Sequence, residues 1–260
     1  MSDRFPPTQP TLSRRDAIGA LALGASLLPV RAGAAERTAV DAIAFDGFPI
    51  FDPRPVGALA KRLFPDRGEA LAQQWSSKLF GYSWLYTAAG QYAGFEEIAD
   101  ASLRFTAEGM RIALSDSDRA ALVGAYAQLD PWPDVKPALV KLRAAGVRLA
   151  FLSNLSEAML RANMARGGIS DLFEHVLSTD RVRQFKPAKA AYAMAIDAFG
   201  LPKARIGFAA FGGWDAAGAS WFGYRTAWVN RFGVPRERIE PGPAITAPGI
   251  EAVLALAGLT

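Results

Sequence analysis

The chain has 260 residues, of which 51% are apolar and 21% are charged, and these values suit a globular protein with one sizeable core. It contains no cysteine, which excludes disulfides, thiolate zinc sites and cysteine nucleophiles. Its only histidine, His175, lies in a strand-like stretch, where we expect a structural role. The net charge of +4 comes without a basic stripe interleaved with aromatic residues, so we expect no nucleic-acid binding.

The chain begins with the pattern of an export signal. Ser13-Arg14-Arg15-Asp16 carries paired arginines, an apolar run follows over residues 17–30, and Ala32-Gly33-Ala34 is an A-x-A cleavage pattern. The apolar run is shorter than the roughly 20 residues that a transmembrane helix needs, so an uncleaved anchor is the less favoured alternative. Residues 1–35 are therefore predicted to be a twin-arginine signal peptide, and the mature protein is expected in the periplasm, free of the membrane.

Five short apolar runs in the remaining chain read as strands buried on both faces. They cover residues 39–45, 147–152, 175–178, 206–211 and 226–230. Helical stretches at residues 138–145 and 187–199 separate some of them, the second with Pro187 at its start and Gly200 just past its end. This alternation predicts an α/β fold with a doubly wound, Rossmann-like parallel sheet.

One long segment breaks the alternation. Between the first two strands the chain shows only helical patterns, at about residues 70–89, 95–109 and 115–129, before Pro131-Trp132-Pro133 marks a return linker. We predict an inserted all-helical cap at residues 57–130 over a core formed by residues 36–56 and 131–260. Such a cap would cover the carboxyl edge of the sheet, where open α/β sheets bind ligands.

Polar residues stand at or just beyond the ends of the predicted strands. They are Asp46, Ser153, Asn154, Lys186 and Asp215. Because the carboxyl ends of parallel strands converge, these side chains are expected to face one pocket. A carboxylate nucleophile needs a cation that keeps it ionised and a second group that orients water, roles that suit Lys186 and Asp215. Taken singly, each residue has a plainer reading as a turn, a helix cap or a solvated side chain; taken together, they favour a site.

These residues lie in four motifs that resemble the haloacid dehalogenase superfamily, and specifically its L-2-haloacid dehalogenases. The motifs are Phe45-Asp46-Gly47-Phe48 with Phe51-Asp52, Leu152-Ser153-Asn154, Phe185-Lys186-Pro187 with Tyr192, and Trp214-Asp215-Ala216-Ala217-Gly218-Ala219 with Phe222-Gly223 and Trp228-Val229-Asn230-Arg231. The predicted cap matches in Trp75 and in Tyr82-Ser83-Trp84-Leu85. The resemblance extends from about residue 39 to the end of the chain.

The resemblance implies a hydrolase in which Asp46 displaces halide from a 2-haloacid and forms an ester, which water then cleaves near Lys186 and Asp215. It implies that Ser153, Asn154, Tyr192 and Trp214 bind the substrate, and it suggests a homodimer. No cofactor or metal is implied. The superfamily's phosphatases carry a second aspartate two residues after the nucleophile, and Phe48 stands there instead.

The sequence departs from the family pattern at three places. Pro49-Ile50 replaces the usual Gly-Thr after the nucleophile, and Ser76 replaces an arginine that binds the departing halide. Ala210 and Gly212 replace a serine and an asparagine. The backbone N–H groups of Phe211-Gly212-Gly213 could compensate by forming an anion-binding nest, or these glycines could simply allow a tight turn. Lys78 lies two residues from Ser76 and thus on another helix face, so it is a poor substitute.

Two functions therefore stay open at this point. The first is a hydrolase of the 2-haloacid dehalogenase type, and this hypothesis includes an enzyme whose substrate has changed. The second is a catalytically weakened relative that binds a small organic acid without dehalogenation. The retained Asp46, Lys186 and Asp215 favour the enzyme, whereas the loss of the arginine at Ser76 favours the second.

Overall fold

The computed structural model describes residues 40–259, so the predicted signal peptide lies outside the described residues. Six parallel strands form one sheet in the order β3-β2-β1-β4-β5-β6. Their bounds are Ala42–Phe45 (β1), Arg148–Ser153 (β2), His175–Ser178 (β3), Ile206–Ala210 (β4), Arg225–Val229 (β5) and Ile245–Ala247 (β6). The predicted doubly wound α/β fold is thus confirmed, with a short sixth strand that was not predicted.

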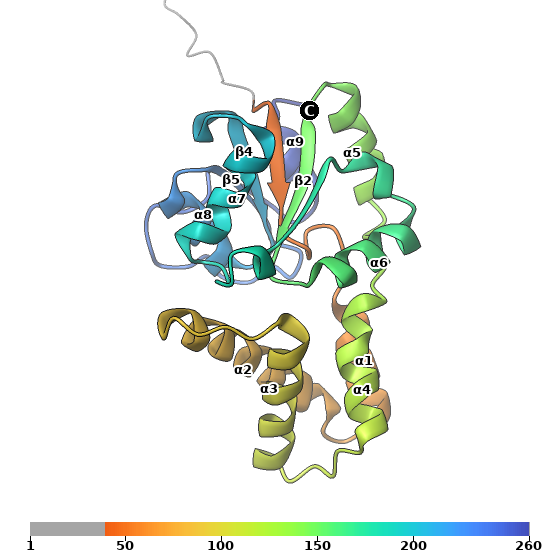
Figure 1. The fold of residues 1–260 in the computed structure, drawn as a ribbon. Helices are drawn as coiled ribbons and strands as arrows, with labels where there is room; N and C mark the ends of the chain where they lie inside the picture. Colours follow the sequence, from red (N-terminus) through yellow and green to blue (C-terminus); the bar gives the residue numbers. More distant parts are fainter. Residues whose placement is uncertain (1–39, 260) are drawn as a thin grey trace, which may run out of the picture. The chain divides into compact units, whose positions relative to one another are not determined.

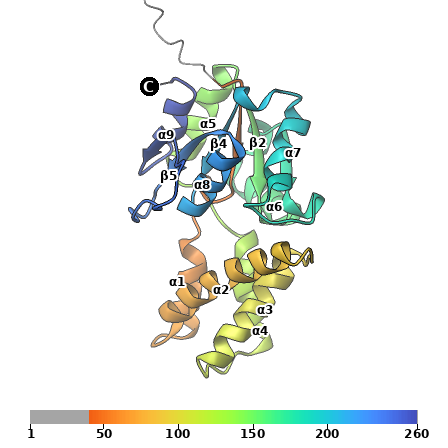
Figure 2. The same cartoon turned by 90° about the vertical axis from the view of Figure 1, so that its left-hand side faces the viewer.

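Helices cover both faces of this sheet (Figures 1 and 2). α7 (Lys189–Phe199) and α8 (Gly213–Phe222) pack on one face, and α5 (Val135–Ala144), α6 (Glu157–Gly167) and α9 (Glu251–Leu256) on the other. Side chains alternate accordingly: Ala42 and Ala44 of β1 join the apolar cluster under α7 and α8, and Ile43 and Phe45 join the opposite cluster. Burial on both faces explains why the strands read as continuous apolar runs.

The chain segment from β1 to α5 forms four helices, and they lie beyond the carboxyl edge of the sheet (Figure 1). They are α1 (Arg54–Leu63), α2 (Gly68–Ala88), α3 (Phe95–Gly109) and α4 (Asp116–Gly124), and a 3₁₀ turn at Ala125–Ala127 follows. We call these elements the cap. The predicted cap boundary at residue 57 falls inside α1, which starts at Arg54 with Pro55 in its first turn.

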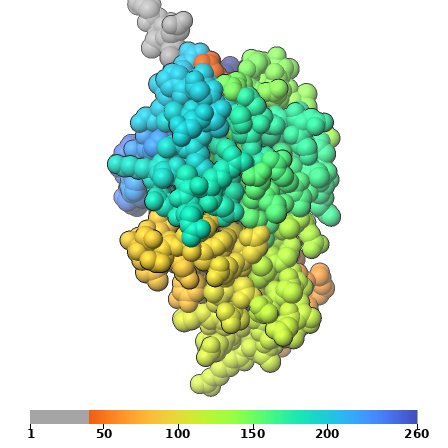
Figure 3. Space-filling model, in the orientation of Figure 1, coloured from red at the N-terminus to blue at the C-terminus, as the bar shows by residue number. Residues whose placement is uncertain are grey.

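The cap packs directly against the rest of the protein, and side chains fill the space between them on the face seen in Figure 3. Ser156 of the core donates a hydrogen bond to Glu96 Oε1 (2.6 Å), and the Phe185 N–H donates to Thr87 Oγ1 (3.1 Å). Tyr92 donates to Asp180. The cap is therefore joined to the loop that leads into Lys186.

Within residues 40–259, no helix has the length and apolar character needed to cross a bilayer.

One predicted helix start is wrong. α7 begins at Lys189 rather than Pro187, because residues 185–188 form a turn closed by a hydrogen bond from the Ala188 N–H to the Phe185 carbonyl (3.0 Å). Ala188 has an extended ψ of 139°. This turn, and not a helix, carries Lys186 toward the end of β1.

Candidate active site

Asp46 follows the last residue of β1, at the centre of the sheet. Its N–H donates to the Ala209 carbonyl of β4 (2.9 Å), and its Oδ2 accepts a weak hydrogen bond from the Phe48 N–H (3.3 Å). The chain then turns at Gly47, where an added Cβ would lie 3.1 Å from both Ser153 Oγ and Leu155 Cδ1. Glycine thus lets the loops after β1 and β2 approach each other closely.

Lys186 joins the two carboxylates of the site. Its Nζ lies 2.7 Å from Asp46 Oδ1 and 2.6 Å from Asp215 Oδ2, and its side chain is only 1% exposed. The Lys186 N–H donates to Asn154 Oδ1 (3.1 Å), which holds the turn against the end of β2. The adjacency of β1 and β4 in the sheet brings the Asp46 loop next to Asp215. Lys186 comes from the loop after β3 and contacts Asp46 although the two residues are 140 positions apart in the chain.

Asp215 lies in the first turn of α8 and is almost completely buried. Its Oδ1 accepts a hydrogen bond from the Tyr192 hydroxyl (2.7 Å) while its Oδ2 accepts from Lys186. Burial raises the pKa of Asp215 to about 6, against the opposing effect of the Lys186 charge. The group therefore titrates near neutrality, the range in which a proton acceptor works well.

Lys186 and Tyr192, which both donate to Asp215, keep their protons. Burial by itself lowers the pKa of Lys186, but the charges of Asp215 and Asp46 outweigh burial, and the pKa is raised. Burial, followed by the charge of Asp215, raises the pKa of Tyr192 well above its ordinary value. The lysine is thus a permanent cation in this site, and the tyrosine is a permanent hydrogen-bond donor.

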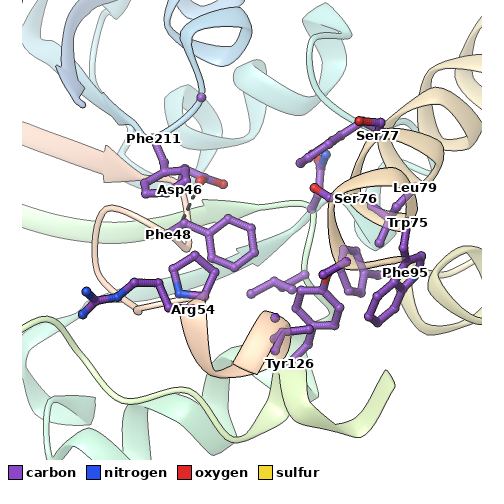
Figure 4. Close-up of a pocket in the computed structure, with 18 of the residues that line it drawn as sticks. Asp46, Phe48, Arg54, Trp75, Ser76, Ser77, Leu79, Phe95, Tyr126 and Phe211 are labelled. Atoms are coloured by element: carbon purple, nitrogen blue, oxygen red, sulfur yellow. Dashed lines mark hydrogen bonds between the residues drawn. The ribbon is translucent and has the colours of Figure 1, made fainter. Parts of the chain in front are cut away.

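A cavity of about 540 Å³ opens beside Asp46, between the sheet edge and the cap (Figure 4). Three of the predicted substrate-binding residues, Ser153, Asn154 and Trp214, line it. The fourth, Tyr192, does not line it: its ring packs against Phe208 and its hydroxyl is turned to Asp215, because helix α7 lies on the face of the sheet rather than at its edge. Tyr192 is therefore a positioning residue.

Most of the remaining wall is apolar and was not recognised in the sequence. It includes Phe48, Val56, Trp75, Leu79, Phe80, Phe95, Tyr126, Phe211 and Phe232. The sequence did carry a signal for one part of the wall: Ala72, Ser76 and Phe80 are spaced by four residues and so share one face of α2. Phe211 and Phe232 had none, because they lie in loops that only the folded chain brings to the cavity.

Ser76 lines the cavity, as expected of the position that holds arginine in the family pattern. Lys78 points elsewhere, with its Nζ 4.0 Å from the centroid of the Phe105 ring. Arg54 is the only cation that lines the described cavity, and its guanidinium donates to both oxygens of Asp52 (2.9 and 2.6 Å) while remaining largely exposed. The described wall therefore offers no unpaired cation to a ligand.

Gly212 is explained by packing. An added Cβ there would lie 2.7 Å from Trp214 Nε1, so glycine allows the Trp214 indole to fold back over the start of α8. The Trp214 ring then packs edge-on against Phe80 and Trp84 of the cap, with centroids 5.3 and 5.5 Å away. This geometry supports the tight-turn interpretation of Phe211-Gly212-Gly213.

The fold and the site together define a Rossmann-like α/β protein whose candidate nucleophile is a carboxylate. Residues 34–223 match the family of haloacid dehalogenase-like hydrolases. The chain is 34% identical to haloacetate dehalogenase H-2 of Moraxella sp. (strain B) over 84% of this chain and 97% of that protein. The chain therefore belongs to the haloacid dehalogenase-like hydrolase family.

Solved structures agree with this assignment. One L-2-haloacid dehalogenase superposes with a TM-score of 0.82 and 38% identity, over 85% of this chain and all of that one. The enzyme from Xanthobacter autotrophicus with chloropropionic acid covalently bound superposes with a TM-score of 0.76 and 29% identity, over 83% and 98% of the two chains. Among residues 40–259, no group of three or more His, Asp or Glu side chains is arranged to hold a metal ion.

The pKa of Asp215 predicts that a plot of kcat/KM against pH declines on its acid side, and we call this decline the acid limb. If ionised Asp215 accepts a proton, kcat/KM falls as the pH drops through about 6. The Tyr192 hydrogen bond lowers this pKa, so Tyr192→Phe raises it and moves the acid limb to higher pH. The matched control is Tyr224→Phe, which removes a hydroxyl bound to the Tyr192 carbonyl and not to Asp215. A profile of kcat/KM against pH for the three proteins checks this; identical acid limbs in wild type and Tyr192→Phe would contradict it.

Proposed function

We propose that this protein is a hydrolytic 2-haloacid dehalogenase that converts an (S)-2-haloacid into a 2-hydroxy acid and halide through an ester on Asp46. The observation that carries the proposal is the Asp46 carboxylate itself. It lies in the wall of the cavity, fixed by Lys186 Nζ at 2.7 Å. Family membership and the dehalogenases that share the fold support it.

In the first step, an oxygen of Asp46 attacks C2 of the substrate, the C2–halogen bond breaks, and halide leaves with the electron pair. Lys186 keeps Asp46 ionised for this attack. Asn154 Oδ1 is occupied by the Lys186 N–H, which directs the amide NH₂ of Asn154 to the substrate carboxylate. The Ser153 hydroxyl accepts from the Leu155 N–H (3.2 Å) and so keeps its own proton for the same carboxylate.

In the second step, water attacks the carbonyl carbon of the Asp46 ester and gives a proton to Asp215. Lys186 Nζ and the Phe48 N–H stabilise the negative charge that develops on the Asp46 oxygens. The bond between Asp46 Cγ and the oxygen now attached to C2 then breaks, so this former Asp46 oxygen leaves in the product alkoxide, which takes up the proton held by Asp215. The water oxygen stays in the Asp46 carboxyl group, which releases its own proton. Because only the first step occurs at C2, and with inversion, an (S)-haloacid becomes an (R)-hydroxy acid.

Displacement at carbon needs no metal, and we expect full activity under chelation.

A second function is favoured by one observation. Ser76 leaves the cavity without the cation that would stabilise a departing halide, and a protein that binds an organic acid without dehalogenation would tolerate that loss. A halide-release assay on 2-chloropropionate separates the two functions. The expected homodimer stays a prediction.

The nucleophile can be tested by isotope transfer. In heavy-oxygen water, a single turnover should place the label in Asp46 and none in the product, because water attacks the Asp46 carbonyl carbon. Asp46→Asn should abolish halide release, whereas Asp41→Asn, at the opposite end of β1 and paired with Arg205, should retain it. Mass spectrometry of the peptide containing Asp46 gives the result. Label in the product of the first turnover would mean that water attacks the substrate directly.

Restoring the missing cation should accelerate the reaction. Negative charge accumulates on the halide as its bond to C2 breaks, and a donor aimed at such charge contributes about 3 kcal/mol, or roughly a hundredfold in rate. We expect the natural protein to act slowly on 2-chloropropionate and Ser76→Arg to raise kcat by up to roughly a hundredfold. Ser76→Ala is the control and should change kcat little. An unchanged kcat in a folded Ser76→Arg protein would favour the non-dehalogenating function.

We propose in addition that residues 1–35 direct export by the twin-arginine route to the periplasm. The paired arginines, the short apolar run and the A-x-A pattern support this. Replacing Arg14 and Arg15 together by lysine should trap the precursor in the cytoplasm, while Arg31→Lys should not. Cell fractionation gives the result, and the mature protein should begin near Ala35. Export that survives the double replacement would point to the general secretory route.

A further inference from the structure

The cavity beside Asp46 is large for a small haloacid. Its volume of about 540 Å³ falls within the range of about 300–1,000 Å³ that is typical of pockets for drug-sized ligands. A 2-halopropionate presents only a methyl group beyond its reacting carbon and its carboxylate. Such a substrate would leave most of the cavity unfilled.

Asp46 and the aromatic side chains of the cap lie in different parts of the cavity wall, and two further apolar rings, Phe48 and Phe211, lie beside Asp46. Asp46 is at one side of the view in Figure 4, and the rings of Trp75, Phe95 and Tyr126 are at the other side. Trp75 Nε1 donates to the Ala99 carbonyl (2.9 Å), so its polar atom is satisfied inside the cap and its ring offers only apolar surface. A substrate whose carboxylate and C2 lie at the sheet edge therefore has an apolar space beyond C2.

Ser76 leaves part of this space open. It stands on α2 next to Trp75, is exposed toward the cavity, and is shorter than the arginine of the family pattern by several atoms. The one lining cation, Arg54, is paired with Asp52. With no unpaired cation in the described wall, the cavity gains affinity for an organic acid mainly by burying apolar surface.

We propose that the preferred substrates are 2-haloacids that carry a large apolar group on C2, such as a chain of four or more carbons or a benzyl group. This inference rests on the proposed dehalogenase function and adds its substrate class. The apolar group fills the space between Ser76 and the aromatic wall of the cap. Its burial provides binding energy that holds C2 against Asp46 and so compensates for the missing cation.

The first experiment is a substrate series. Halide release is measured with (S)-2-bromopropanoate, (S)-2-bromohexanoate and (S)-2-bromo-3-phenylpropanoate, which share a leaving group and an unbranched carbon next to C2. Each buried methylene is expected to raise kcat/KM roughly fourfold, so the hexanoate should exceed the propanoate roughly fiftyfold. A kcat/KM that is flat or falls with size overturns the inference and leaves the dehalogenase function standing.

The second experiment fills the cavity. Ser76→Leu occupies the open space without adding charge, at an exposed helical position that tolerates leucine. It should lower the preference for the phenyl substrate over the propanoate at least tenfold. Gln74→Leu is the matched control, because Gln74 is exposed on the same helix and does not line the cavity. Its preference should equal that of the wild type; an unchanged preference in Ser76→Leu overturns the inference.

A third measurement separates this inference from the function on which it rests. Calorimetry with the corresponding 2-hydroxy acids reports binding of the products without any chemistry. Affinity that rises with size, together with halide release, supports both proposals. Affinity that rises with size while no member of the halogenated series releases halide overturns the dehalogenase function. Affinity that does not rise with size overturns the large apolar substrate.

Discussion

The site depends on one buried cation, the Lys186 ammonium, held between two carboxylates. Removing such a charge from water costs several kcal/mol, and only close ionic and hydrogen-bonding partners offset that cost. Asp46 and Asp215 are these partners, with carboxylate oxygens 2.7 and 2.6 Å from Lys186 Nζ. Asp46 follows β1 and Asp215 follows the adjacent strand β4. Two adjacent buried carboxylates would repel each other without the lysine. The same three groups therefore hold the loops together and set the charge of the nucleophile.

The environment of Asp215 divides the work between the two carboxylates. Asp215 is almost fully enclosed and accepts from Tyr192, whereas Asp46 faces the cavity. Enclosure raises the pKa of Asp215 to about 6 and keeps this carboxylate out of the cavity wall. Exposure to the cavity makes Asp46 the carboxylate that a substrate meets first. The cap supplies a largely apolar part of the wall, which includes Trp75, Leu79 and Phe80.

Much of this arrangement was predictable, since it follows from residue type and spacing. Asp46, Ser153 and Asn154 come directly after or at the end of buried strands, and parallel strands end at a common edge. The helical insertion was visible because its apolar residues repeat with the period of a helix. β6 was not visible in the sequence, because its three residues are only partly buried and lie in a stretch rich in proline and glycine that carries no long apolar run.

The sequence alone determined five of the six strands, the helical insertion after the first of them, the charge-bearing residues at the sheet edge, and the loss of arginine at Ser76, because these depend on residue identity and local periodicity. Only the tertiary structure decided which side chains meet. Tyr192 contacts Asp215 and does not line the cavity. Arg54 does line the cavity, but its guanidinium is paired with Asp52. The size of the cavity was likewise undecided in the sequence, because volume arises from how α1, α2 and the loops after β4 and β5 pack, and packing depends on contacts distant in the chain.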